Sequence, residues 1–195
     1  MGNRRSTAIG RGIPKNGEVT DVKTLVTGGV RSGKSRHAEA LLTDLSPVTY
    51  VAPGPTIAED PDPDWAARIR SHQERRPPHW TTLETRDLVE ALRTPGPVVV
   101  DCLGTWLAAV LDQRGLWEAA SEDVLAVITE LLDQAVEVLA KRDQVVLVTN
   151  EVGLGVVPAH RSGRLFRDLL GVVNQSLAAA CDEVHLVIAG RVLVL

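Results

Sequence analysis

Residues 24–35 read TLVTGGVRSGKS, and this stretch decides the fold. Residues 28–35 match the pattern G-x-x-x-x-G-K-[ST], in which a glycine-rich turn follows a buried strand and opens a helix. Glycines let backbone N–H groups turn inward around phosphate oxygens, and the helix N-terminus adds partial positive charge. We therefore predict a phosphate-binding loop rather than a chance glycine-rich turn. It consists of Gly28, Gly29, Val30, Arg31, Ser32, Gly33, Lys34 and Ser35.

The loop also predicts a magnesium site. In loops of this kind the lysine, here Lys34, reaches the β- and γ-phosphates, and the hydroxyl of Ser35 can bind Mg²⁺. A second oxygen ligand is expected at the end of another strand, and residues 98–101 read VVVD. We expect Asp101 to hold Mg²⁺ directly or through water, with a purely structural carboxylate as the alternative.

The chain around this loop alternates between β-branched apolar runs and longer helical stretches. Strands are predicted at 23–27, 48–52, 98–101, 144–150 and 183–188, and helices at 34–42, 64–74, 121–142 and 161–180. This alternation predicts an α/β fold with a mostly parallel sheet flanked by helices. Gly190-Arg191 lies between two apolar runs and predicts a type II′ hairpin turn that ends the sheet with an antiparallel strand.

Composition narrows the class of protein. The 195 residues suit a single domain, and the formal net charge of −4 speaks against nucleic-acid binding, which depends on neutralising phosphates. The two cysteines, Cys102 and Cys181, cannot form a disulfide framework, which favours a reducing cytoplasm. No apolar run approaches the roughly 20 residues of a membrane span.

Residues 1–22 are polar and basic, and we expect them to form a flexible tail before a domain at 23–195. Met1-Gly2 with Ser6 fits a loose myristoylation pattern, and Arg4-Arg5 resembles half of a twin-arginine signal. Both patterns are short, so a plain tail is the preferred interpretation.

A second candidate chemistry lies in residues 65–80, WAARIRSHQERRPPHW. His72 shares a helical face with Ile69 and Arg68. Nearby cations favour the neutral, nucleophilic imidazole and could also bind a polyphosphate, an arrangement that suits attack on phosphorus. The alternative is an ordinary surface or capping histidine.

Several long segments, in order, resemble the bifunctional adenosylcobinamide kinase/adenosylcobinamide-phosphate guanylyltransferase family of cobalamin biosynthesis. They are LVTGGVRSGKSRHAEALL (25–42), ARIRSHQERRPPHW (67–80), VVVDCLGTWL (98–107), VTNEVGLGVVP (148–158) and FRDLLGVVNQSLAAACDEVHLVIAG (166–190), and the resemblance covers about 23–195. It implies a RecA-like P-loop domain in a homotrimer. It also implies phosphorylation of adenosylcobinamide with ATP or GTP, followed by GMP transfer from GTP through a guanylylated histidine, which is His72 here.

The resemblance implies further nucleotide contacts. Those after the second strand fall at Ala52-Pro53-Gly54, where the family more often has Thr in place of Pro53. Glu84 matches an acid that could accept hydrogen bonds from N1 and N2 of guanine. The segment that contacts GTP directly after the histidine corresponds to Gln73, Glu74, Arg75 and Arg76.

Two other functions remain open at this point. A monofunctional P-loop kinase for another small hydroxyl substrate would share the phosphate loop but have no use for His72. A non-catalytic nucleotide-binding switch module would transfer nothing to cobinamide. The helix that carries His72 favours the bifunctional interpretation over both.

Overall fold

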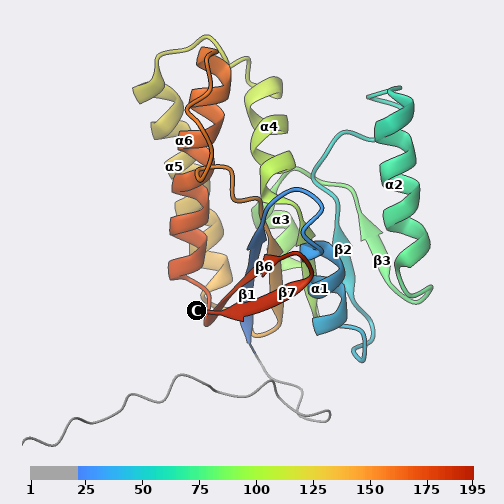
Figure 1. The fold of residues 1–195 in the computed structure, drawn as a ribbon. Coiled ribbons are helices and arrows are strands. Elements are labelled where there is room, and N and C mark those ends of the chain that lie inside the picture. The colour runs from blue at the N-terminus through green and yellow to red at the C-terminus, as the bar shows by residue number, and fades with distance from the viewer. Residues whose placement is uncertain (1–21) are drawn as a thin grey trace, which may run out of the picture.

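The structure is a computed structural model that describes residues 22–195 (Figure 1). The expected tail at 1–22, with its myristoylation and twin-arginine patterns, lies outside the described residues except for Val22. None of the helices in the described part is both long and apolar enough to cross a membrane.

A seven-stranded sheet forms the centre of the fold, in the order β3-β2-β4-β5-β1-β6-β7. Every pair is parallel except β6–β7, which confirms the predicted parallel sheet with a C-terminal antiparallel strand. β5 lies between the strand before the phosphate loop and the strand that ends at Asp101. The strands are β1 (Lys23–Gly28), β2 (Thr49–Val51), β3 (Thr81–Leu83), β4 (Val98–Asp101), β5 (Val145–Val148), β6 (Glu183–Ile188) and β7 (Arg191–Val194).

Helices cover both faces of this sheet. They are α1 (Lys34–Leu41), α2 (Pro63–Arg75), α3 (Leu88–Arg93), α4 (Leu103–Gln113), α5 (Ser121–Leu139) and α6 (Arg161–Ala179). Figure 1 shows α4, α5 and α6 grouped on one side, with α1 on the other and α2 standing apart beyond β3. The helices predicted at 34–42, 64–74 and 161–180 are present within one residue at each end, whereas α5 ends three residues before the predicted position 142.

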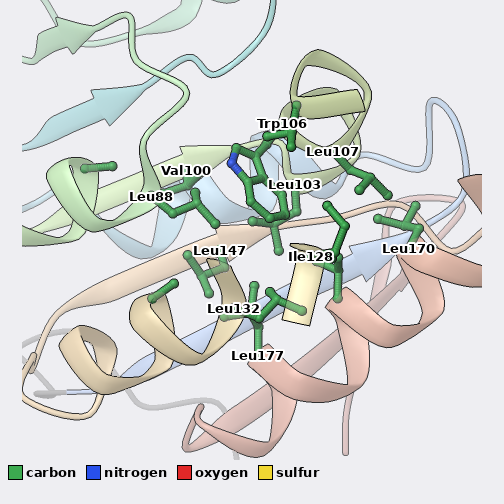
Figure 2. Close-up of a cluster of buried hydrophobic side chains, with 14 of the residues drawn as sticks. Leu88, Val100, Leu103, Trp106, Leu107, Ile128, Leu132, Leu147, Leu170 and Leu177 are labelled. Carbon is green, nitrogen blue, oxygen red and sulfur yellow. The ribbon is translucent and has the colours of Figure 1, made fainter. Parts of the chain in front are cut away.

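Alternating residues along a strand pack into two separate hydrophobic cores. Val98 and Val100 face the larger cluster with α3 to α6, and Val99 between them faces the smaller cluster with α1, as the period of two in a strand requires. Figure 2 shows the larger cluster, where Trp106 and Leu107 of α4 pack beside side chains of α5 and α6. These apolar cores hold the carboxyl ends of the strands, where the candidate site lies, in fixed positions.

The predicted hairpin is present, but the prediction of its turn was wrong by one residue and in the turn type. Ile188 pairs with Arg191, so the two-residue loop is Ala189-Gly190 rather than Gly190-Arg191. Both loop residues have positive φ, 49° and 75°, which is the backbone of a type I′ turn. Arg191 therefore belongs to β7.

Three elements were not predicted: β3, α3 and α4. The strand β3 has only three residues, two of them exposed, so it lacks an apolar pattern. The helix α4 follows β4 after one residue, Cys102, and the side chain of Thr105 reaches back to the Cys102 N–H to complete a capping arrangement. Neither Cys102 nor Thr105 is an obvious helix-start signal, so the sequence reads as one apolar run.

Candidate active site

The backbone of β6 packs directly against the first glycine of the phosphate loop. A Cβ on Gly28 would lie 2.4 Å from the carbonyl oxygen of Val187 and 2.8 Å from Oγ of Ser32, so the loop excludes any side chain there. Gly33 has φ +99° and stands at the N-cap of α1, a left-handed conformation that favours glycine. Helix α1 therefore begins at Lys34, and its first N–H groups face the loop.

Inside the loop, Lys34 is only 6% exposed, and its Nζ donates to the carbonyl of Gly29 at 3.3 Å. Burial lowers the pKa of Lys34, while the charge of Asp101 acts in the opposite direction. The buried Oγ of Ser32 has no hydrogen-bond partner among the described residues. An unsatisfied hydroxyl and a buried ammonium suit the oxygens of a phosphate.

Helix α2 places His72 over the sheet. The side chain of Asp62 accepts hydrogen bonds from the N–H groups of Asp64 and Trp65, and Pro63 occupies the first helical position, so the helix start is well defined. Arg76, directly before Pro77, has an extended backbone and ends the helix. His72 thus lies in the last turn of α2.

His72 lies close to one residue on each of two neighbouring strands, β2 and β4. The phenol of Tyr50, on β2, donates to Oδ2 of Asp101 on β4 at 2.9 Å. The Tyr50 oxygen lies 3.3 Å from Nδ1 of His72, and the Asp101 Oδ2 lies 3.6 Å from the same nitrogen. Asp101 therefore links the two predicted chemistries, because its charge also acts on Lys34.

The electrostatics keep the imidazole neutral. Burial is the largest influence and lowers the pKa of His72, with Asp101 opposing it and Arg75 adding to it. The cations named from the sequence are thus secondary to burial. Burial also raises the pKa of Tyr50 well above its ordinary value, so its phenol keeps its proton.

A cavity of about 70 Å³ opens beside His72. It brings together many of the predicted residues: Ala52, Gly54, His72, Gln73, Arg76, Glu84 and Asp101. Tyr50, Trp65 and Thr82 also line it and were missed from the sequence. Trp65 could have been found from the sequence, because it lies seven residues before His72 and so shares its helical face. Tyr50 could not, because a single tyrosine in an apolar strand is typical of a core residue.

Other predicted residues lie elsewhere. Pro53 is buried outside the cavity, and Glu74 is exposed and does not line it. Arg75 forms an ion pair with Glu39 of α1, with Nη2 3.0 Å from Oε1. The phosphate loop itself, residues 28–35, does not line the cavity, although the charge of Asp101, which does line it, acts on Lys34.

Two groups of side chains could hold a cation. Ser35 and Asp101 offer a hydroxyl and a carboxylate, the hard oxygen ligands that Mg²⁺ prefers. In addition, Glu39, His72 and Asp101 bring one ligand atom each within 4.8 Å of one another. Arg75 already pairs with Glu39 in that second group, so a cation there would compete with the guanidinium.

Comparison with solved structures gives distant matches. The flagellar accessory protein FlaH from Methanocaldococcus jannaschii is 14% identical with a TM-score of 0.41, covering 89% of this chain and 75% of that one. The P4 protein of bacteriophage phi6, in complex with ADP, is 17% identical with a TM-score of 0.40, covering 88% and 52%.

Sequence relatives are much closer. The bifunctional adenosylcobalamin biosynthesis protein CobU is 42% identical over 176 residues in Salmonella typhimurium and 44% identical over 179 residues in Escherichia coli. Each match covers 85% of this chain and 95% of the relative. CobP of Pseudomonas aeruginosa, with the same description, is 35% identical over 177 residues, covering 87% and 94%. The family described as cobinamide kinase/cobinamide phosphate guanyltransferase matches residues 24–195, and the chain belongs to it.

Proposed function

We propose that this chain phosphorylates adenosylcobinamide with ATP or GTP and then transfers GMP from GTP, through guanylylated His72, to give adenosylcobinamide-GDP. Family membership supports the pair of reactions. The observation that supports the residue assignment is the 3.6 Å separation between His72 Nδ1 and Asp101 Oδ2, because the charge of Asp101 also acts on Lys34 of the phosphate loop. A monofunctional kinase would leave this arrangement without a purpose.

The kinase step uses the phosphate loop. Lys34, buried at the start of α1, neutralises charge on the phosphates. The N-terminal N–H groups of α1 and the Ser32 hydroxyl donate hydrogen bonds to the phosphate oxygens. Ser35 and Asp101 would hold Mg²⁺, and a bound magnesium ion supplies charge neutralisation on the triphosphate. Gly28, Gly29, Val30, Arg31 and Gly33 complete the loop around the phosphates.

The guanylyl step uses the cavity beside α2. His72 is neutral and therefore nucleophilic at neutral pH, because burial lowers its pKa. Glu84 at the cavity wall would accept from N1 and N2 of guanine, a donor pair that adenine lacks. The Trp65 ring, fixed by the hydrogen bond from its Nε1 to the Pro55 carbonyl at 2.9 Å, offers an apolar wall. Arg68 and Arg76 supply positive charge for the phosphates.

Assembly and location are part of the proposal. We assign a homotrimer because the family resemblance implies one. Leu154 and Val156 support an assembled state, since they are 88% and 96% exposed in the loop that follows β5 and would gain from being covered. A cytoplasmic location is supported by Cys102 and Cys181, which are both free thiols.

Incubation with GTP labelled in the α-phosphate tests the proposal. We expect an acid-labile, alkali-stable adduct in the wild-type protein and in His79→Ala, which changes an exposed histidine outside the cavity, but none in His72→Ala. His72→Ala should still phosphorylate adenosylcobinamide. Phosphorylation without any adduct in the wild type would identify a monofunctional kinase, and no cobinamide-dependent nucleotide consumption would identify a switch module.

A further inference from the structure

We propose that Tyr50 is a positioning residue that keeps the proton of the neutral His72 ring on Nδ1, so that GMP is carried on Nε2. This inference rests on the guanylyl transfer proposed above and assigns the ring atom that performs it. It adds Tyr50 to the site, a residue that the motif around His72 does not contain.

The Tyr50 hydroxyl can donate only one hydrogen bond. A phenol has one hydrogen, and that hydrogen is donated to Oδ2 of Asp101 at 2.9 Å. The Tyr50 oxygen can then only accept from Nδ1 of His72, 3.3 Å away. Oδ2 of Asp101, 3.6 Å from the same nitrogen, is also an acceptor.

Two acceptor oxygens therefore face Nδ1, and this fixes the tautomer. A proton on Nδ1 is attracted to both oxygens, whereas a lone pair there would oppose both in a half-buried setting, where such repulsion is costly. The neutral ring consequently carries its proton on Nδ1 and its free lone pair on Nε2. Nε2 is on the ring edge turned away from Tyr50 and Asp101.

Tyr50 is held firmly enough to impose this choice. Its backbone is paired on both sides, with Thr82 on β3 and Val99 on β4, and its side chain is only 1% exposed. The guanidinium of Arg76 lies 3.3 Å from the centre of the phenol ring and donates to Oγ1 of Thr82 at 2.9 Å. The phenol is therefore clamped between the sheet and a cation.

Both steps of the GMP transfer can occur while the proton stays on Nδ1 of His72. The Nε2 lone pair attacks the α-phosphorus of GTP, the bond from that phosphorus to the bridging oxygen breaks, and pyrophosphate leaves with the electron pair. The ring is now a cation whose Nδ1–H faces Asp101, which stabilises it. An oxygen of the substrate phosphate then attacks phosphorus, and the P–Nε2 electrons return to the ring.

The test labels the histidines of the full chain with ¹⁵N and identifies the attached nitrogen by ³¹P–¹⁵N coupling after incubation with GTP. We expect coupling to Nε2 of His72. Coupling to Nδ1 would overturn the role of Tyr50 while leaving guanylyl transfer intact. Absence of any adduct would instead overturn the transfer itself, together with the inference that rests on it.

A variant separates positioning from structural support. Tyr50→Phe removes the hydroxyl and keeps the ring under Arg76. We expect ¹⁵N spectra of its unreacted His72 to show both neutral tautomers, and guanylylation to slow by roughly 10- to 100-fold. Thr49→Val, the preceding residue on β2, should keep a single Nδ1–H tautomer. A Tyr50→Phe protein with the wild-type tautomer and rate would refute the assignment. The tautomer is the decisive measurement, because a loss of packing alone would change neither the tautomer nor the attachment site.

Discussion

Arg75 and Glu39 tie the helix that carries His72 to the helix that follows the phosphate loop, with Nη2 of Arg75 3.0 Å from Oε1 of Glu39. Side-chain exposures are 33% for Arg75 and 10% for Glu39. The two partners are therefore unequal, because one can be solvated when left alone and the other cannot.

This inequality predicts an order of stability. Arg75→Ala leaves a buried carboxylate without its partner and should lower the free energy of unfolding by about 1–3 kcal/mol. Glu39→Gln leaves an arginine that water can reach, so its cost should be smaller. Urea denaturation measures both. Lys141→Ala, which breaks the exposed pair with Glu137, serves as the control and should change stability by less than about 1 kcal/mol. Equal losses for the first two variants would contradict this account.

Gly28 should tolerate no side chain. Its added Cβ would lie 2.4 Å from the carbonyl oxygen of Val187, a backbone atom that cannot move cheaply. We expect Gly28→Ala to weaken ATP binding at least tenfold, as measured by calorimetry, and to lower the melting temperature. Gly171→Ala is the matched control, since an added Cβ there meets nothing within 4 Å and should stabilise α6 by about 0.5–1 kcal/mol. Unchanged ATP affinity in Gly28→Ala would show that the loop can rearrange.

Glu84 should select guanine. Hydrogen bonds to a charged group contribute about 1.5–3 kcal/mol, so Glu84→Gln should raise the KM for GTP in adduct formation by about 10-fold or more. The rate with α-labelled ATP should change little, which narrows the preference for GTP. Glu130→Gln, an exposed change on α5, should retain the wild-type preference. A Glu84→Gln enzyme with unaltered preference would place guanine elsewhere.

Cys181 should resist alkylation. Burial raises the pKa of its thiol from 9.0 to about 12, and the thiolate is the reactive form. At about pH 8 the folded protein should therefore react with iodoacetamide roughly a thousandfold more slowly at Cys181 than the urea-unfolded chain. The same shift destabilises the fold at high pH: the contribution of the neutral thiol is complete below pH 9.0 and is lost as pH rises toward about 12. Mass spectrometry of the labelled peptide gives the rates, and equal rates in both states would disprove the shift.

The sequence was sufficient for the phosphate loop and most of the sheet, because those signals are local. Gly28, Gly33 and Lys34 occur at fixed spacing, and the buried strands are short runs of valine and leucine. The start of α4 was hidden because Cys102 joins β4 to the helix without a glycine, proline or strong cap. The hairpin turn shifted by one residue because Ala189 adopts a positive φ that is uncommon for alanine.

The site was predictable where its residues come from motifs and not where they meet through packing. His72, Asp101 and Glu84 were named from the sequence and all line one cavity. Tyr50 reaches His72 only because α2 folds back over the carboxyl end of β2. Arg75, predicted beside the nucleotide, is held by Glu39 instead, a contact between segments 36 residues apart that no local pattern indicates.

The helix α2 differs from its neighbours in how easily it can open. Of its 13 residues only Ala66 is buried, whereas α5 and α6 each bury five side chains. Hydrogen exchange should therefore be fastest, among these three helices, for the amides of α2, through openings that cost less than global unfolding. The histidine is thus carried by the least buried of these three helices, whereas the phosphate loop follows β1, a strand paired on both sides within the sheet.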